Sequence, residues 1–287
     1  MPQDKRAPLA SAVSAQQAPR DSTPPERGPV AGLQAELHAG TPVTEDAGRI
    51  LSVLSSGDIE LKGRIPWSSN ATFLVSVYGA PPGEGAAGPG EDLLAIYKPT
   101  SGERPLWDFP RGLWSREVAA YELCSFMGWD IVPPTTARSD GPLGPGSLQF
   151  CIDATPDEHF FTLVEDPRHH RALRRIAAFD LVANNADRKS GHCLLDKDGH
   201  IWAIDHGLCF HTDPKLRTVI WDFAGEKLDQ DLLAPLELLA GAEVPAILES
   251  LLSEEEITAI SARAKTALAH RRYPKPRGDF PYPWPLI

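Results

Sequence analysis

The first half of the chain alternates apolar and polar residues in short stretches, a pattern that is typical of β-strands with one buried face. Strands are predicted at 58–65, 73–78, 93–98, 132–137 and 147–152. The segment 113–127 instead carries apolar residues at helical spacing and stops at Gly128, which favours a helix end. The segment 48–55 fits either a helix start or a strand. We therefore expect a small antiparallel sheet that carries one helix.

Longer helical periods dominate the second half of the chain. Helices are predicted at 168–182, 228–252 and 254–270. Ser253 is placed to cap the last helix, ahead of three glutamates. Between the first two helices, the turn sequence Asp196-Lys197-Asp198-Gly199 predicts a hairpin of strands 193–195 and 201–204. This half is expected to be a helical lobe with one hairpin.

The two ends differ in composition from the middle of the chain. The N-terminal stretch is rich in Ala, Pro, Gln, Ser and Arg without an apolar period, which predicts a disordered tail. The last residues are rich in Pro and aromatic side chains and are expected to pack extended along the surface. The predicted division is a tail at 1–44, a sheet-rich N-lobe at 45–155, a helical C-lobe at 156–272 and an extension at 273–287. The fold class is α+β with two lobes.

The charge of the chain narrows the classes of partner. The 287 residues include 28 Lys and Arg against 39 Asp and Glu, a net charge of −11. This balance argues against a general nucleic-acid binder and against a protein held to anionic lipid by charge alone. No apolar run approaches the ~18 residues of a membrane span, so no stable membrane insertion is expected. The start of the chain lacks a signal-peptide core, and four dispersed cysteines predict reduced thiols in a cytoplasmic protein.

Two carboxylates flank the predicted hairpin. Asp187 lies in the polar loop after the helix 168–182, and Asp205 follows the second hairpin strand. The hairpin brings both to one end, where they suit a divalent cation and a proton acceptor, the groups that phosphoryl transfer needs. The plainer interpretation is that Asp187 caps a turn and Asp205 ends a strand.

Polar residues of the N-lobe stand in an order that fits nucleotide binding. Lys98 ends a strand, and Glu117 on the next helix could pair with it. The turn that contains Ser68, Ser69 and Asn70 is small and polar, so its backbone N–H groups can lie over phosphates. Each residue alone also fits a solvated surface position, but together they favour a nucleotide-binding enzyme.

These residues resemble the phosphatidylinositol 3- and 4-kinase superfamily, and more closely a small bacterial branch of it without an assigned substrate. The resemblance covers residues 58–252 and is carried by Ile96-Tyr97-Lys98-Pro99, Glu117, Asn185-Ala186-Asp187-Arg188 and Ala203-Ile204-Asp205-His206-Gly207-Leu208. It implies a two-lobed protein-kinase-like fold with ATP between the lobes.

The resemblance also implies a role for each residue. Lys98 would hold the α- and β-phosphates, Glu117 would fix Lys98, and Asp187 would accept the proton of the acceptor hydroxyl. Asp205 and His192 would hold Mg²⁺ or Mn²⁺. The residues implied to contact ATP are Ser68, Ser69, Asn70, Lys98, Gln149, Phe150, Cys151 and Ile152. The implied reaction moves the γ-phosphate of ATP to a hydroxyl of a protein, lipid or inositol.

Two histidines depart from the family pattern. His192 stands where kinases carry the Asn that holds a second metal ion, and His206 replaces the Phe or Asn of the Asp-x-Gly motif. A nucleotide-binding pseudokinase or an adaptor therefore remains an alternative. A metal-dependent hydrolase built on His192, His206, His211 and Asp205 is less favoured, because their spacings match no short zinc pattern.

Overall fold

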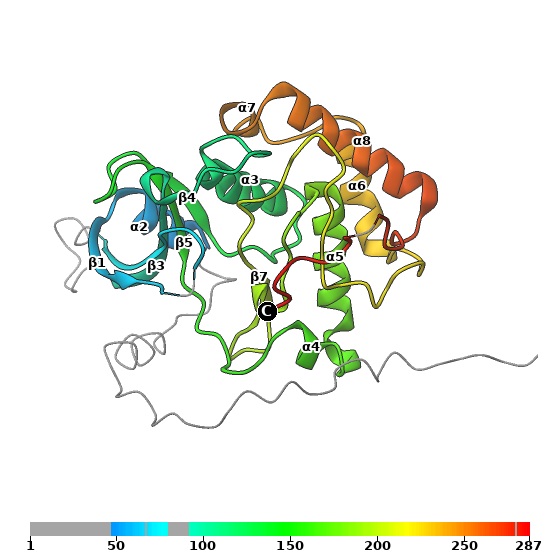
Figure 1. The fold of residues 1–287 in the computed structure, drawn as a ribbon, viewed down its shortest axis with the longest axis horizontal. Helices are drawn as coiled ribbons and strands as arrows, with labels where there is room; N and C mark the ends of the chain where they lie inside the picture. Colours follow the sequence, from blue (N-terminus) through cyan, green and yellow to red (C-terminus); the bar gives the residue numbers. More distant parts are fainter. Residues whose placement is uncertain (1–46, 67, 80–91, 279) are drawn as a thin grey trace, which may run out of the picture.

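The computed structural model describes residues 47–66, 68–79, 92–278 and 280–287, which fold into two lobes (Figure 1). The N-lobe holds a five-stranded antiparallel sheet in the order β1-β2-β3-β5-β4. Its strands are β1 (Asp58–Arg64), β2 (Phe73–Tyr78), β3 (Asp92–Pro99), β4 (Thr135–Arg138) and β5 (Gly146–Phe150). The predicted strands are confirmed, but β4 starts later than expected. Pro133 and Pro134 precede it and have no amide hydrogen to donate to a ladder.

The N-lobe sheet has its core on the side of α2 (Ala47–Ser56), so the segment that fitted either class is a helix. Ile50 and Leu54 of α2 are buried with apolar residues of β2, β3 and β5. Buried and half-exposed residues alternate along β3, and Tyr97 belongs to the α2 side. Lys98 therefore points to the other face of the sheet, where it contacts α3.

Helix α3 (Leu113–Phe126) connects the lobes, because it packs against β4 and β5 of the N-lobe and against α7 (Leu248–Leu251) of the C-lobe. Its first turn is capped by a residue that lies earlier in the chain and outside the helix. The Glu103 carboxylate accepts the backbone N–H groups of Gly112 and Trp114 at 2.8 and 3.1 Å. The predicted helix at 113–127 is confirmed to within one residue.

The C-lobe is helical, with α4 (Phe160–Leu163), α5 (His170–Ala183), α6 (Leu233–Ala240), α7 (Leu248–Leu251) and α8 (Glu254–His270). The single helix predicted over 228–252 is wrong. Gly241 ends α6, Ala242 adopts a left-handed φ of 64°, and Pro245 cannot continue a helical ladder. The helix predicted at 254–270 is confirmed with its cap, since the Ser253 hydroxyl accepts the Glu256 N–H.

The predicted hairpin is confirmed as β6 (Cys193–Leu195) and β7 (Ile201–Ala203). Short 3-10 turns lie at Thr100–Gly102, Pro167–His169, Ser190–His192 and Gln230–Leu232. After α8, the chain runs extended along the C-lobe and ends beside β7 in Figure 1.

The tail predicted at 1–44 lies outside the described residues, and so does the stretch 80–90, whose Gly, Pro, Ala and Glu residues predict a loop. The boundaries of the four predicted regions therefore stay predictions. All four cysteines are described, and they are free thiols. Within the described ranges, no helix is long and apolar enough to cross a membrane.

Candidate active site

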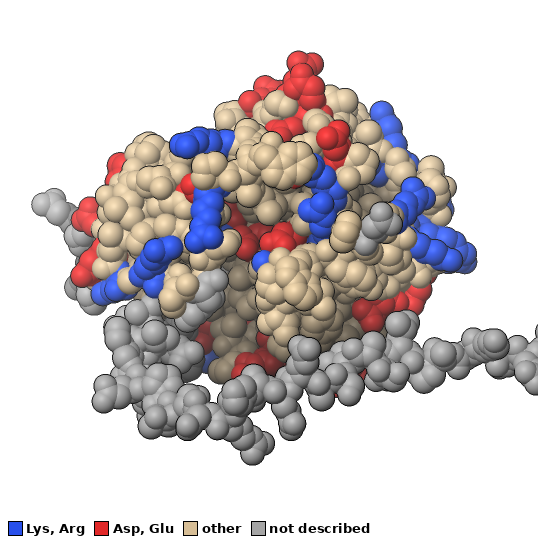
Figure 2. All heavy atoms as spheres, in the orientation of Figure 1, with Lys and Arg blue, Asp and Glu red and all other residues tan. Residues whose placement is uncertain are grey.

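Three charged side chains from three elements meet between the lobes. The Lys98 ammonium at the end of β3 donates to the Glu117 carboxylate on α3, and it lies 2.9 Å from Oδ1 of Asp205, just after β7. The second oxygen of Glu117 accepts the backbone N–H of His206 at 2.9 Å. Asp205 has a left-handed φ of 60°, a strained conformation for a residue other than glycine. Figure 2 shows Asp and Glu side chains in the hollow between the two lobes.

The charges of this cluster depend on one another. Burial by itself would lower the pKa of Lys98, but the carboxylates of Asp205 and Glu117 outweigh it and raise that pKa above its usual value. Burial would raise the pKa of Asp205, but Lys98 holds it well below the usual range. Lys98 is therefore charged and Asp205 ionised at neutral pH. The Asp205 side chain is 49% exposed, so a ligand can reach its oxygens.

Asp187 lies in the loop that follows α5, close to this cluster. Its carboxylate is 3.1 Å from the Lys189 ammonium, and its backbone N–H donates to the Asn185 side chain at 2.9 Å. Burial raises the pKa of Asp187 to about 6, although Lys189 opposes the rise. A carboxylate with a pKa near neutrality is suited to accept a proton at physiological pH.

A buried ion pair holds the Asp187 loop on the hairpin. Arg188 and Asp180 are both fully buried, and the guanidinium donates to both Asp180 oxygens at 2.9 to 3.2 Å. The same guanidinium donates to the Ile204 carbonyl at 2.6 Å and contacts Nε2 of His206 at 2.8 Å. The pairing of these two residues was not predicted from the sequence. The signal that could have found it was a carboxylate, Asp180, on the apolar face of a helix.

His192 lies beside Asp205, as the family resemblance implied. Its Nε2 is 3.4 Å from Oδ2 of Asp205, and its Nδ1 accepts the backbone N–H of Lys189 at 3.3 Å. Burial lowers the pKa of His192 to about 4, although Asp205 opposes the fall, so the imidazole is neutral at physiological pH.

The side chains beside Lys98 fit a divalent cation that is bound partly by the protein and partly by phosphate. In the described part of the chain, no three His, Cys, Asp or Glu side chains are grouped to hold a metal ion. Asp205 and His192 supply two donors, and Mg²⁺ at phosphate sites usually takes one or two protein ligands besides phosphate and water. The exposed oxygens of Asp205 and the neutral nitrogen of His192 are therefore compatible with such an ion.

The four residues of the hydrolase alternative are not assembled into one site. His206 is buried against Arg188, and its ring packs edge-on against Phe179. His211 accepts the Asp213 N–H at 2.9 Å, and its ring packs edge-on against Phe109. This separation removes the geometric basis for a zinc hydrolase.

The polar turn between β1 and β2 packs on the segment that follows β3. The Ser68 hydroxyl is 2.9 Å from the Thr72 hydroxyl, and the Asn70 side chain accepts the Arg104 N–H at 3.0 Å. Ser69 is exposed. Among the hydrogen bonds and ion pairs of the described residues, none joins this turn to the cluster around Lys98. The proposed cover over phosphates therefore stays a prediction.

The predicted adenine contacts lie where the chain leaves the sheet for the C-lobe. Gln149 and Phe150 end β5, and the Gln149 amide donates to Thr135 at 2.9 Å. The Cys151 N–H already donates to the Leu94 carbonyl at 3.0 Å, and the Ile152 carbonyl accepts the N–H of Ala154, also at 3.0 Å. Any contact to adenine from these two residues would therefore come from other backbone groups. These groups are the carbonyl of Cys151 and the N–H of Ile152.

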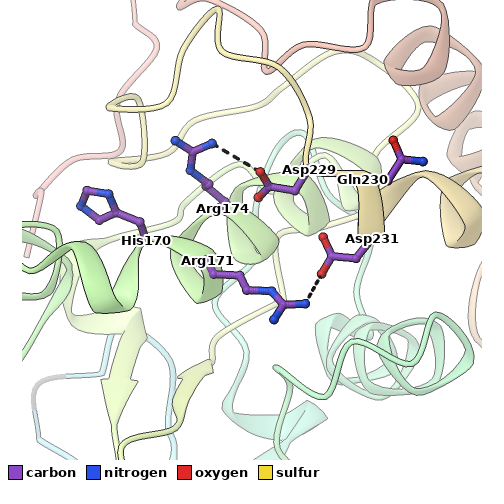
Figure 3. A pocket seen from close by; sticks show the side chains of 6 residues that line it. All are labelled: His170, Arg171, Arg174, Asp229, Gln230 and Asp231. Atoms are coloured by element: carbon purple, nitrogen blue, oxygen red, sulfur yellow. Dashed lines mark hydrogen bonds and ion pairs between the residues drawn. The ribbon is translucent and has the colours of Figure 1, made fainter.

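An open cavity of about 550 Å³ lies on another part of the C-lobe, at the start of α5 (Figure 3). It is lined by His170, Arg171, Arg174, Asp229, Gln230 and Asp231. Its cations are already engaged: Arg171 pairs with Asp231 at 2.8 Å, and Arg174 with Asp229 at 3.5 Å. None of the predicted site residues lines it.

Comparison with known proteins finds one relative that is similar over most of the chain. No family model matches it. Over 278 residues, it is 38% identical to protein Rv2133c of Mycobacterium tuberculosis, a match that covers 82% of this chain and 95% of that protein. The chain belongs to the Rv2133c family.

The Rv2133c family member described here is also similar to a plant protein over a shorter range. It is 31% identical over 160 residues to phosphatidylinositol 4-kinase gamma 4 of Oryza sativa subsp. japonica, covering 42% of this chain and 27% of the plant protein. Among solved structures, it is similar to hydra Fam20 with sugar, at a TM-score of 0.50 and 13% identity, covering 81% of this chain and 90% of that one. The expected two-lobed, protein-kinase-like fold is confirmed.

Proposed function

We propose that this protein is an ATP-dependent phosphotransferase that moves the γ-phosphate to a hydroxyl group. The observation that carries the proposal is the position of Lys98 between Glu117 and Asp205. In protein kinases, an ion pair between a β3 lysine and a helix glutamate must form, and a metal-binding aspartate must stand beside it. A lysine that only solubilised the surface would not bridge two carboxylates from distant segments.

Each residue has a role in the proposed reaction. Lys98 holds the α- and β-phosphates, and Glu117 fixes the ammonium in place. Asp187 takes the proton of the acceptor hydroxyl while the hydroxyl oxygen bonds to the γ-phosphorus and ADP leaves. Lys189 keeps the carboxylate of Asp187 ionised before the transfer.

Asp205 and His192 are the residues that would hold Mg²⁺ or Mn²⁺. A bound divalent ion would neutralise charge on the phosphate oxygens. Since Mg²⁺ prefers oxygen donors in octahedral geometry, the His192 nitrogen favours Mn²⁺.

ATP would lie between the predicted lobes 45–155 and 156–272. The adenine would face the backbone of 149–152, and the triphosphate would extend past Lys98 toward the turn 68–70. This placement is supported by the end of β5, from which the chain crosses into the C-lobe.

We further propose a relationship to phosphatidylinositol 3- and 4-kinases, which the similarity to the rice protein supports over 42% of the chain. The acceptor hydroxyl belongs to a protein, a lipid or an inositol. The segment 210–223 would meet it and offers two cations, Lys215 and Arg217. Lys215 is engaged by Asp108 at 2.8 Å, which leaves little charge for a multiply phosphorylated head group. The free cysteines fit a cytoplasmic location.

The second candidate is a pseudokinase that binds nucleotide without turnover. The observation that favours it is the histidine at position 192, where kinases place an oxygen ligand. The two candidates differ in turnover but share metal-dependent nucleotide binding.

The test is transfer of labelled γ-phosphate by the purified chain, supplied in turn with protein extract, lipid vesicles and inositol. We expect Asp187→Asn to keep ATP binding and to lower turnover by about 10²–10⁴, the usual worth of a positioned base. Asp205→Asn should instead weaken metal-dependent ATP binding. Asp198→Asn removes an exposed carboxylate from the turn between β6 and β7 and serves as the matched control.

Unchanged phosphate transfer in both active-site variants would refute the proposed roles. Metal-dependent ATP binding with no transfer to any acceptor, from the wild-type chain, would favour the pseudokinase.

A further inference from the structure

The C-terminal segment, residues 271–287, contains both cations and large apolar side chains. Its first part carries four cations, Arg271, Arg272, Lys275 and Arg277, and its second part reads Phe280-Pro-Tyr-Pro-Trp-Pro-Leu-Ile287. One carboxylate, Asp279, stands between the two parts. In a chain of net charge −11, this segment is therefore locally basic.

The cations of the segment are available to a partner. All four are exposed. Arg272 donates to the Gly225 carbonyl at 2.6 Å, whereas Arg271, Lys275 and Arg277 form no ion pair among the described residues. Figure 2 shows Lys and Arg side chains at the edge of the molecule where, in Figure 1, α8 ends. Unpaired cations keep their full attraction for an anionic surface.

Three apolar side chains of the segment point outward, although its backbone is hydrogen-bonded to the C-lobe and Tyr273 is buried there. The Pro281 carbonyl accepts the N–H of Thr218 at 3.2 Å and the indole N–H of Trp221 at 3.1 Å. Even so, the exposed fraction is 79% for Phe280 and 88% for Trp284. Ile287 is also largely exposed. Burial in this protein's own core thus does not explain these side chains.

We propose that the C-terminal segment docks the protein on an anionic lipid membrane. Trp, Tyr and Phe favour the interface between lipid and water, and nearby cations attract acidic head groups. The aromatic side chains and the cations both have to act here, because the net charge of −11 on the whole chain repels an anionic membrane. An acidic protein would satisfy the cations, but it would not need three large apolar side chains held away from their own fold.

The segment also ends beside the candidate active site. The Leu286 carbonyl accepts the N–H of Ser190 at 2.9 Å, in the loop between Asp187 and His192. Docking would place that loop near lipid head groups. Only the value of this position for catalysis rests on the proposed phosphotransfer. The docking itself does not depend on it.

The experiment measures binding of the full chain to sedimenting vesicles, made either of phosphatidylcholine or of phosphatidylcholine with phosphatidylglycerol. We expect binding to the anionic vesicles that weakens with added salt and is much weaker to the neutral ones. Lys275→Gln with Arg277→Gln should weaken it by about 25-fold, at about fivefold for each cation. The matched control is Lys62→Gln with Arg64→Gln, two exposed cations on β1.

A second pair of variants tests the apolar part. Trp284→Ser should weaken binding, whereas Trp107→Ser, which removes an equally exposed indole elsewhere, should not. Equal binding to both vesicle types, or equal losses in segment and control variants, would overturn the proposal. Absence of vesicle binding would also overturn it and would favour a protein partner. ATP binding, measured without lipid, reports separately on the proposed function.

Discussion

One buried arginine on α3 contacts the C-lobe and stands next to the glutamate that pairs with Lys98. Arg116 is 3% exposed, donates to the Cys209 carbonyl at 2.6 Å, and pairs with Glu256 at the start of α8. Its guanidinium also lies 5.3 Å from the centre of the Phe109 ring. We predict that Arg116→Met loosens α3 from the C-lobe, so that Glu117 no longer fixes Lys98.

The loss of stability in Arg116→Met depends on the hydrogen bonds that Glu256 keeps. Removing one member of a buried ion pair costs about 3–5 kcal/mol. We expect the lower end, about 3 kcal/mol, because the Glu256 carboxylate still accepts the Ser253 N–H at 3.0 Å. At 2–4 °C for each kcal/mol, the melting temperature should fall by about 6–12 °C. Glu256→Gln keeps a hydrogen-bonding side chain and should cost about 1 kcal/mol.

The assay must distinguish a loss of folding stability from a displacement of Glu117. Leu236→Ala on α6 is the matched control, since it removes a buried side chain at a cost of about 2–5 kcal/mol away from α3. Well below both melting temperatures, Arg116→Met should raise the KM for ATP about tenfold, the worth of one hydrogen bond to a charged group. Leu236→Ala should leave this KM unchanged. Equal KM values in the two variants would refute the reasoning.

Three further predictions concern the loop between α5 and β6. Turnover should fall as the pH drops through about 6, where Asp187 takes up a proton. Lys189→Met should move the midpoint of the pH–rate profile upward, because the Lys189 ammonium lowers the pKa of Asp187, and identical profiles of the two proteins would contradict this role. Turnover should be faster with Mn²⁺ than with Mg²⁺, and His192→Asn should reverse the preference in paired rate measurements. Asp180→Asn leaves Arg188 buried without a counter-charge and should lower the free energy of unfolding in urea by about 3–5 kcal/mol; a loss below about 1 kcal/mol would mean that water reaches the guanidinium.

Local sequence determined the elements whose signals lie within a few residues. Ser253 and the glutamates after it specify where α8 begins, because the hydroxyl and the first amides of a helix are neighbours in the chain. The alternation at 73–78 specifies β2 in the same way. Over 228–252, the apolar period continued through Gly241 and Pro245, so periodicity alone predicted one helix where the backbone forms two.

Part of the candidate site was also predictable from order along the chain. Lys98, Glu117 and Asp205 were each recognised from motif and spacing, and the structure brings the three together. The Ser68–Asn70 turn has no such confirmation, because what it covers depends on a ligand and on how the loop packs. The contacts of Arg116, next to Glu117, were not predicted.

Tertiary structure alone decided which distant charges pair. Lys98 and Asp205 are 107 residues apart, and Arg116 and Glu256 are 140 apart, so no local pattern relates them. Packing also decided that Asp180 is buried and paired with Arg188, while the cations after α8 remain exposed. A net charge of −11 describes the whole chain. Electrostatic energy depends on the distance between charges and on the water around them, and folding sets both.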